Sequence, residues 1–187
     1  ARGRVLDLGA GVGSHALALQ ERGLAVTAID ALPQAVEVMR GRGVTDARLG
    51  RWTELPTDER FDTVLMMMNG AGLAGTLNGM TALLEVLVGV LSENGQILVD
   101  SVNLPEVREA ESDEAGVPVG GDGRYPGELH YQLSYRGHRG DLVPQLFLDF
   151  GQLRRMAAGV GLECDLVAEE DDLYLAVMRS AGDPPSP

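Results

Sequence analysis

The stretch VLDLGAGVGSHALAL, residues 5–19, decides the fold of this 187-residue chain. A strand-like apolar run that contains Asp7 leads into glycines at alternate positions, Gly9, Gly11 and Gly13, and a helical pattern begins directly after them. Glycine is needed where the backbone takes a positive φ or where a ligand lies against the main chain. A strand, a glycine-rich turn and a helix place bare backbone amides at the carboxyl edge of a parallel sheet. The stretch therefore predicts a ligand site near the start of the chain.

Strand and helix patterns alternate over most of the sequence, which is typical of an α/β domain with a mostly parallel sheet. We expect strands at 5–8, 24–30, 45–50, 61–68 and 96–101, with helices at 14–22, 33–40 and 76–91 between them. A helix at 150–158 and strands at 162–168 and 173–178 close the pattern. The turn between the last two strands is short, so we predict that they are antiparallel.

One section, residues 103–148, interrupts this alternation. Residues 103–127 join an acidic run to a stretch rich in Gly and Pro, which predicts a long flap in which Pro105 opens a short helix. Residues 128–150 alternate apolar and polar side chains around a turn, which predicts an inserted β-hairpin. We therefore expect a single domain with a core at 1–102 and 149–179, an inserted flap and hairpin at 103–148, and a disordered tail at 180–187.

The composition indicates a globular protein with an acidic surface. Asp and Glu outnumber Lys and Arg by 28 to 15, and the arginines are scattered singly, so a nucleic-acid partner is not expected. No apolar run approaches the roughly 18 to 20 residues that cross a bilayer, so no membrane partner is expected. The single cysteine, Cys164, excludes an internal disulfide and a cysteine-based metal site. We predict a cytoplasmic protein without a metal; the oligomeric state stays open, a homodimer included.

Asp30, at the end of the second predicted strand, narrows the choice of ligand. A carboxylate there can accept hydrogen bonds from both hydroxyls of a ribose. The loop reads Gly-x-Gly-x-Gly, with Ser14 where the dinucleotide fingerprint has its third glycine, and Asp7 would repel a pyrophosphate. An ammonium and a sulfonium suit that carboxylate, and S-adenosylmethionine carries both. An NAD(P)-dependent oxidoreductase shares the glycine loop and the acid, and it remains the alternative.

Several motifs carry a resemblance to a known family. VLDLGAGVG together with VTAID resembles the first two cofactor motifs of class I S-adenosylmethionine-dependent methyltransferases. GRWTELP, FDTVLMM and LVGVLSENGQILVDS resemble the later motifs, so the resemblance covers about residues 4–101, and the closing helix and strands also fit. It implies a Rossmann-like three-layer sandwich whose seven-stranded sheet has an antiparallel last strand, with S-adenosylhomocysteine as the product.

The resemblance also implies which residues contact the cofactor. The loop and its acid would cradle the methionine part, and Asp30 would bind the ribose. Arg51 stands where many members carry an acid for the adenine amino group, and Trp52 is a candidate to stack on the base. Asn69 follows the fourth strand, where the family places residues close to the transferable methyl. The full predicted set is Asp7, Gly9, Ala10, Gly11, Gly13, Asp30, Ala31, Leu32, Arg51, Trp52, Met68 and Asn69.

No catalytic residue follows from the sequence. Methyl transfer from a sulfonium is an in-line displacement, so the protein mainly aligns the two reactants and excludes water. His130, on the polar face of the predicted hairpin, is a candidate base, with an exposed strand residue as the alternative interpretation. We expect a small-molecule acceptor, with 103–148 covering the site. A non-catalytic module that binds S-adenosylmethionine is the further alternative.

Overall fold

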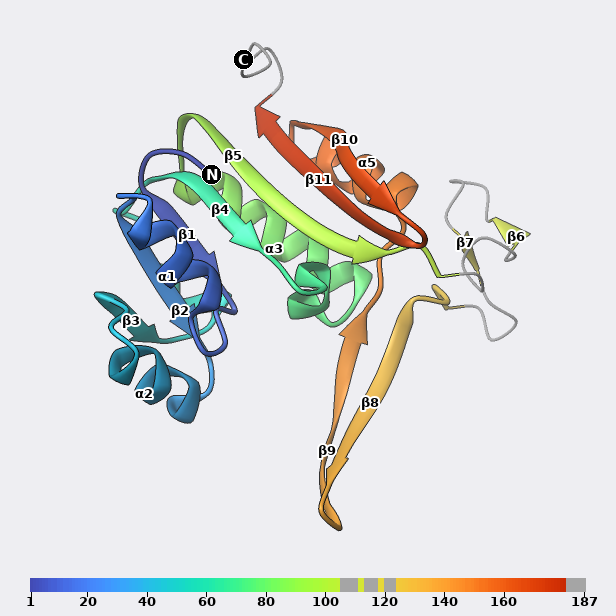
Figure 1. Ribbon diagram of the computed structural model, residues 1–187. Helices are drawn as coiled ribbons and strands as arrows, with labels where there is room; N and C mark the ends of the chain where they lie inside the picture. The colour runs from blue at the N-terminus through green and yellow to red at the C-terminus, as the bar shows by residue number, and fades with distance from the viewer. Residues whose placement is uncertain (105–110, 113–117, 120–123, 181–187) are drawn as a thin grey trace.

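The computed structural model describes residues 1–104, 111–112, 118–119 and 124–180, and its strands and helices alternate along the chain (Figure 1). The first elements are β1 (Val5–Leu8), α1 (Ser14–Glu21), β2 (Val26–Asp30), α2 (Pro33–Gly41), β3 (Asp46–Leu49), η1 (Trp52–Glu54), β4 (Phe61–Met66), η2 (Gly70–Ala74), α3 (Leu77–Val90) and β5 (Leu91–Val102). They are followed by β6 (Glu111–Ser112), β7 (Pro118–Val119), β8 (Glu128–Tyr135), β9 (His138–Leu146), α5 (Phe150–Gly159), β10 (Leu162–Glu170) and β11 (Leu173–Ser180). η1 and η2 are short 3₁₀ helices.

Seven of these strands form one sheet in the order β10-β11-β5-β4-β1-β2-β3. The strands from β3 to β5 in this order run parallel, whereas β11 is antiparallel to both β5 and β10. The predicted Rossmann-like α/β fold with an antiparallel last strand is therefore confirmed. The strand order reverses between β1 and β4, and in such sheets ligands bind beyond the carboxyl ends of the strands at that point.

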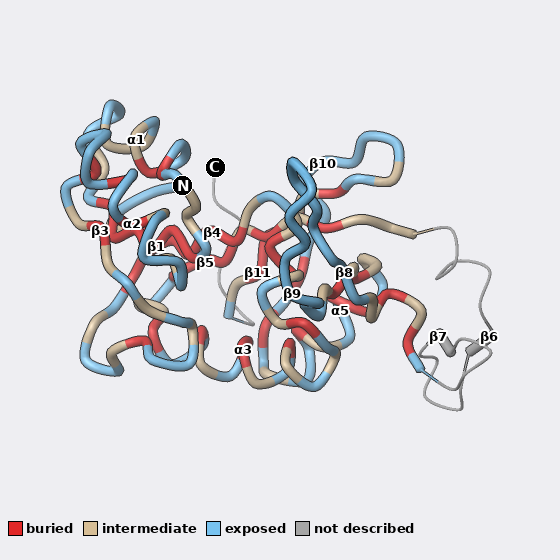
Figure 2. Tube along the Cα trace, turned by 90° about the horizontal axis from the view of Figure 1, so that it is seen from below, coloured by how far each residue is buried: buried red, intermediate tan, exposed pale blue. Residues whose placement is uncertain are grey.

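Helices cover both faces of the sheet and fix the loops at its carboxyl edge. On one face, an apolar stripe on α3 buries Met80, Leu84 and Leu87 completely, and Leu153 of α5 is buried with them. On the other face, α1 and α2 pack on the first three strands, and Ala16 is buried at that contact. Figure 2 shows the buried residues following the sheet through the middle of the molecule. Each large apolar side chain buried in this way contributes roughly 1.5–3 kcal/mol.

Several strands begin or end one to five residues away from the predicted boundaries, and β4 and β5 are two of them. β4 ends at Met66 rather than at residue 68, and shortly after it Met68 (φ 67°) and Asn69 (φ 59°) adopt left-handed conformations that turn the chain away from the extended direction. β5 begins directly after α3, at Leu91, so the predicted turn over 92–95 lies inside this strand. The extra residues are accommodated by a shift in the register between β5 and β4.

The predicted hairpin is confirmed as β8 and β9. Its turn is shorter than the turn over residues 136–141 that the sequence RGHRGD suggests. Arg136 (φ 49°) and Gly137 (φ 81°) form a two-residue turn with positive φ at both positions, which matches the twist of paired strands. β9 therefore begins at His138 and ends at the fully buried Leu146. Elsewhere the hairpin is largely exposed and extends away from the sheet (Figures 1 and 2).

The segment 103–127, which we expected to be an irregular flap, contains two short strands, β6 and β7, that pair with each other. The short helix expected at Pro105 lies outside the described residues, as do most of the acidic run and residues 181–187. Ser180, which was expected in the disordered tail, is the last residue of β11.

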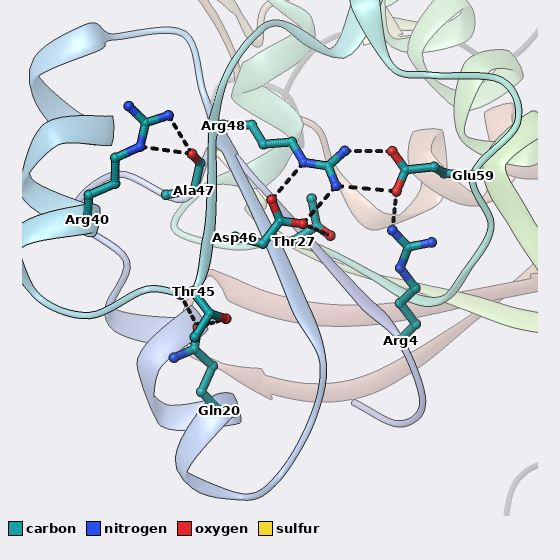
Figure 3. A network of polar contacts seen from close by, with 9 residues as sticks. All are labelled: Arg4, Gln20, Thr27, Arg40, Thr45, Asp46, Ala47, Arg48 and Glu59. Atoms are coloured by element: carbon teal, nitrogen blue, oxygen red, sulfur yellow. Dashed lines mark hydrogen bonds and ion pairs between the residues drawn. The ribbon is translucent and has the colours of Figure 1, made fainter.

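A polar network ties the edge strand β3 to its neighbours (Figure 3). The Arg48 guanidinium donates to Asp46 Oδ2 at 2.7 Å and to Glu59 Oε1 at 2.6 Å. Thr27 of β2 donates its hydroxyl to Asp46, and Arg4 pairs with Glu59. Because Arg48 favours their ionised forms, the pKa values of Asp46 and Glu59 lie below the ordinary carboxyl values. These pairs tie β3 to β2 and to the segments that precede β1 and β4.

Candidate functional site

A cleft of about 280 Å³ lies beyond the carboxyl ends of β1 and β2, beside the reversal of the strand order. It is lined by Leu8, Gly9, Ile29, Asp30, Ala31, Gly50, Arg51, Trp52, Thr53 and Leu73. Segments far apart in sequence therefore meet here: the glycine loop, the end of β2, the start of η1 and the 3₁₀ helix η2. The walls are mostly apolar with one carboxylate, which is the usual make-up of a small-molecule site.

The glycine loop leaves bare backbone facing this cleft. Gly9 (φ 74°) and Gly11 (φ 56°) both take left-handed conformations. A Cβ on Gly9 would lie 2.8 Å from Leu73 Cδ2, so this position is constrained by packing as well as by φ. A Cβ on Gly11 would meet nothing within 4 Å, so the surface at this residue is open. The loop thus combines one residue packed against the cleft wall with one residue accessible to a ligand.

Asp30 holds the loop in place from the end of β2. Its Oδ2 accepts the backbone N–H of Gly11 at 2.8 Å, and its Oδ1 accepts the backbone N–H of Leu32 at 2.8 Å. A carboxylate offers about four lone-pair positions, so each oxygen can still accept one hydroxyl. The geometry therefore suits the pair of hydroxyls on a ribose while it keeps the loop fixed.

Asp7 is the unusual group of the site. Its side chain is 2% exposed, and its Oδ2 has no hydrogen-bond partner among the described residues. Burial raises its pKa to about 6, an effect that His15 and the backbone N–H of Ala16 partly oppose. A buried, unpaired carboxylate oxygen is costly unless a cation or donor reaches it. The ammonium of an amino-acid group is such a partner.

Trp52 closes the opposite wall of the cleft. Its indole Nε1 donates to the Leu73 carbonyl at 3.2 Å, which joins η1 to η2 across the cleft. Arg51, which stands where many members of the resembled family carry an acidic residue, is exposed and also lines the cleft. The wall on this side is therefore a half-buried indole beside a cation rather than a carboxylate.

The structure brings together only part of the predicted site. Gly9, Asp30, Ala31, Arg51 and Trp52 line the cleft. The remaining members of the predicted set, which do not line it, are Asp7, Ala10, Gly11, Gly13, Leu32, Met68 and Asn69.

Three predicted residues lie outside the lining of the cleft: Met68 and Asn69, which follow β4, and His130, which lies in the hairpin. Met68 is 84% exposed. Asn69 uses its side chain to bind Ser101 and β9. His130, the candidate base, is exposed in β8 opposite Pro144. Among the described residues, no hydrogen bond joins His130 to an acidic side chain.

Sequence reasoning missed Leu73, which forms the far wall of the cleft. No local pattern indicates it, because it reaches the cleft only through the tertiary position of η2. The segment NGAG, residues 69–72, was the available signal, since it comes shortly after β4 and segments after strand ends gather at the carboxyl edge of a parallel sheet.

A second groove of about 420 Å³ lies at the carboxyl end of β5. It is lined by Met67, Asp100, Ala168, Glu169, Glu170, Leu173, Tyr174 and Leu175. Asp100 is opposite Leu175 in the register of β5 and β11, so the groove lies on the same edge of the sheet as the cleft. Its apolar floor and three carboxylates would favour a ligand that is both apolar and cationic.

Other kinds of site receive no support from the described residues. Within them, no group of three or more His, Cys, Asp or Glu side chains is arranged to hold a metal ion. Within the same ranges, no helix is long and apolar enough to span a membrane. Cys164 is buried in β10, as expected for a cysteine that packs like a small apolar residue.

The cleft and the residues of the glycine loop and β1 beside it fit S-adenosylmethionine. The unpaired oxygen of Asp7 suits an ammonium, the open backbone at Gly11 admits close approach, and Asp30 keeps free lone pairs for a ribose. The mostly apolar pocket at Trp52 suits a purine.

Comparisons with known proteins agree with this chemistry. Residues 5–95 match a family model described as a methyltransferase domain. A SAM-dependent methyltransferase from Bacteroides fragilis, solved with S-adenosyl-L-homocysteine, is 39% identical with a TM-score of 0.83; the match covers 97% of this chain and 73% of that one. The cypemycin N-terminal methyltransferase of a Streptomyces species is 32% identical over 63% of this chain and 50% of that protein.

An uncharacterized methyltransferase of Mycobacterium tuberculosis is 46% identical over 34% of this chain and 27% of its own length. The chain therefore spans about half the length, or less, of the curated relatives it matches. The likeness to the Bacteroides protein extends over nearly the whole chain. This chain belongs to the S-adenosylmethionine-dependent methyltransferases.

Proposed function

We propose that the protein transfers a methyl group from S-adenosylmethionine to a small-molecule acceptor and releases S-adenosylhomocysteine. The observation that carries the proposal is the buried Asp7 carboxylate, whose Oδ2 has no partner among the described residues, beneath a glycine loop held by Asp30. A pyrophosphate would be repelled by Asp7, which argues against the NAD(P)-dependent alternative.

Each part of the cofactor has a proposed place along the cleft. Asp7 and the backbone from Gly9 to Gly13 hold the methionine part, and Asp30 binds the ribose hydroxyls. Ala31 and Leu32 border the adenine, with Trp52 against its face. When bound, the cofactor supplies a methyl group activated by a sulfonium.

The remaining task of the chain is to align the acceptor and to exclude water. We propose that the hairpin β8–β9, with the segment at 103–127, covers the acceptor side. The position of the hairpin supports this, because its base packs on η2, which also supplies Leu73 to the cleft. Met68 and Asn69 follow β4 at the same edge of the sheet.

An amine is a second candidate acceptor, and one observation favours it. The Streptomyces relative is named as an N-terminal methyltransferase, and an amino group is the acceptor that we propose by analogy. The groove beside β5 places Asp100, Glu169 and Glu170 around an apolar floor, which complements a protonated amine on an apolar body.

We further propose a cytoplasmic location and an acceptor that is not a nucleic acid. The formal charge of −13 supports the second point, because a phosphate backbone would be repelled over most of the surface. The buried, unpaired thiol of Cys164 suits a reducing compartment.

Calorimetric titration tests the cofactor assignment. We expect S-adenosylhomocysteine to bind and NAD not to bind. Asp30→Asn, which removes the charge beside the ribose site, should weaken S-adenosylhomocysteine binding, whereas Asp58→Asn at an exposed position should not. Binding of NAD in place of S-adenosylhomocysteine would overturn the proposal.

A labelled methyl donor then tests catalysis. Transfer of label to one member of a panel of small molecules, amines included, would establish the activity. Binding of the cofactor without transfer to any acceptor class would instead favour a non-catalytic module.

A further inference from the structure

The 3₁₀ helix η2 lies between the base of the hairpin and the cofactor cleft. On the cleft side, its Leu73 lines the wall, approaches Gly9 and accepts the Trp52 indole N–H at 3.2 Å. On the hairpin side, Gln145 of β9 packs so closely on Gly72 that a Cβ there would overlap its side-chain amide. One short element therefore contacts both parts of the proposed site.

Asn69, the residue that precedes η2, is held by hydrogen bonds to both neighbours of this element. Its Nδ2 donates to the Leu146 carbonyl of β9 at 3.2 Å, and its Oδ1 accepts the Ser101 hydroxyl of β5 at 2.8 Å. The Ser101 oxygen in turn accepts the backbone N–H of Leu148 at 3.0 Å. Asn69 thus connects the returning strand of the hairpin to the end of β5.

The backbone at this point is strained, and a second set of hydrogen bonds maintains it. Met68 and Asn69 are consecutive non-glycine residues in the left-handed region, a conformation that persists only where the surroundings enforce it. Asp100 supplies that constraint, because its two oxygens accept the backbone N–H groups of Met68 and Gly70 at 3.0 Å each. Strain of this kind is concentrated at functional sites.

We infer that Asn69 is a positioning residue that sets the Leu73 wall of the cofactor cleft according to the position of the hairpin. The inference rests on the proposed function, because it concerns how tightly the cofactor is held. Binding of the cofactor against Leu73 should restrain η2 and, through Asn69, the base of β9. Because such coupling is reciprocal, an acceptor that contacts the hairpin should change the affinity for the cofactor by the same factor.

The test compares Asn69→Gly with the matched control Asn94→Gly. Glycine tolerates the left-handed backbone at both positions, since Asn94 has a φ of 61° and is exposed, so only the side chain is lost. Calorimetry gives the affinity for S-adenosylhomocysteine, and hydrogen exchange measured by mass spectrometry follows the peptide 142–149 with and without it.

In the wild-type protein and in Asn94→Gly, S-adenosylhomocysteine should slow exchange in 142–149. In Asn69→Gly the affinity should fall about five- to tenfold, as expected for the loss of one or two hydrogen bonds, and saturating S-adenosylhomocysteine should no longer slow that exchange. Asn69→Asp keeps the acceptor for Ser101 and loses the donor to Leu146, so its affinity for S-adenosylhomocysteine should lie between those of the wild-type protein and Asn69→Gly. This variant also provides the test if Asn69→Gly does not fold.

The outcomes separate the two proposals. If the wild-type protein does not bind S-adenosylhomocysteine, the proposed function fails. If the wild-type protein binds it but exchange in 142–149 does not respond, or if Asn69→Gly keeps both the affinity and the response, the role of Asn69 is overturned while the function stands.

Discussion

Replacement of the buried carboxylate, Asp7→Asn, tests the assignment of the cleft through two opposite effects of pH. In the free protein the pKa of Asp7 is raised from 3.8 to about 6, mainly by burial. The folded state therefore binds a proton more tightly than the unfolded state, and the free energy of unfolding falls as the pH rises from 4 through 6. A shift of this size corresponds to about 3 kcal/mol.

Asparagine has a similar shape and no charge to bury, so Asp7→Asn should be more stable than the wild type above pH 7 by up to about 3 kcal/mol, and the difference should vanish near pH 4. Urea denaturation of the free protein at pH 5 and pH 8 measures this. The exposed variant Asp58→Asn serves as the control and should change stability little at either pH.

Binding of S-adenosylhomocysteine should respond to pH in the opposite sense. An ammonium beside Asp7 favours the ionised carboxylate, which is about one-tenth populated at pH 5 and nine-tenths at pH 7 for a pKa of about 6. The affinity should therefore rise about tenfold between these pH values, with release of a proton that calorimetry in two buffers can detect. Asp7→Asn should abolish both effects and bind more weakly at pH 7.

The sign of the pH dependence also discriminates between ligands. A pyrophosphate at the same place would bind less tightly as Asp7 ionises, so the NAD(P)-dependent alternative predicts a fall in affinity where the methyltransferase predicts a rise. An affinity for S-adenosylhomocysteine that stays constant between pH 5 and pH 7, or that changes equally in Asp7→Asn, would refute the reasoning.

Other parts of the structure give further tests. Gly9→Ala places a methyl group 2.8 Å from a leucine of η2 at a φ of 74° and should weaken S-adenosylhomocysteine binding by about tenfold or more in calorimetry, whereas Gly23→Ala, with open space around it, should lower stability only. Trp52 is the single tryptophan, so its fluorescence should change saturably with S-adenosylhomocysteine, and Trp52→Phe should weaken binding about fivefold by loss of one hydrogen bond. Arg48→Met should lower the free energy of unfolding by about 1 kcal/mol at pH 7, since the pair with Glu59 is partly exposed. Because the pKa of Glu59 is lowered, this loss should shrink as the pH falls below the ordinary carboxyl pKa and Glu59 becomes protonated, and a loss that stays the same over an acid titration would contradict the ion-pair account.

Most of the fold could be predicted from the sequence because its signals are local. The glycine loop at 9–13, the apolar run of β4 and the stripe on α3 each specify an element within a few residues, and the short turn before β11 requires an antiparallel pair. The errors occurred where long-range contacts decide the backbone. Residues 92–95 fall within β5 between Leu91 and Gln96, which pair with Phe61 and Thr63 of β4, and no local pattern indicates that the strand already begins at Leu91.

The acidic residues and glycines of the site could be predicted from the sequence. Leu73, which forms the far wall of the cleft, could not. Asp30 and Gly9 follow strands, so their place at the carboxyl edge is fixed by the topology. Leu73 reaches the cleft through the position of η2. That position depends on the left-handed turn at Met68 and Asn69, whose backbone Asp100 holds by two hydrogen bonds. Nothing in the local sequence encodes that combination of strain and distant hydrogen bonds.

Asp30 and Asp7 show two different uses of a carboxylate, one in the lining of the cleft and one buried beside it. Asp30 is already engaged by two backbone N–H groups, so the loop is ordered before any ligand arrives and little entropy is lost on binding. Asp7 is left with an unpaired oxygen, so the free protein carries a cost that a cation can remove. The first arrangement fixes the shape of the site, and the second makes affinity depend on the charge of the ligand. A variant that relieved the cost at Asp7 would gain stability and lose selectivity for a positively charged nucleoside, a trade-off common where function requires a destabilised group.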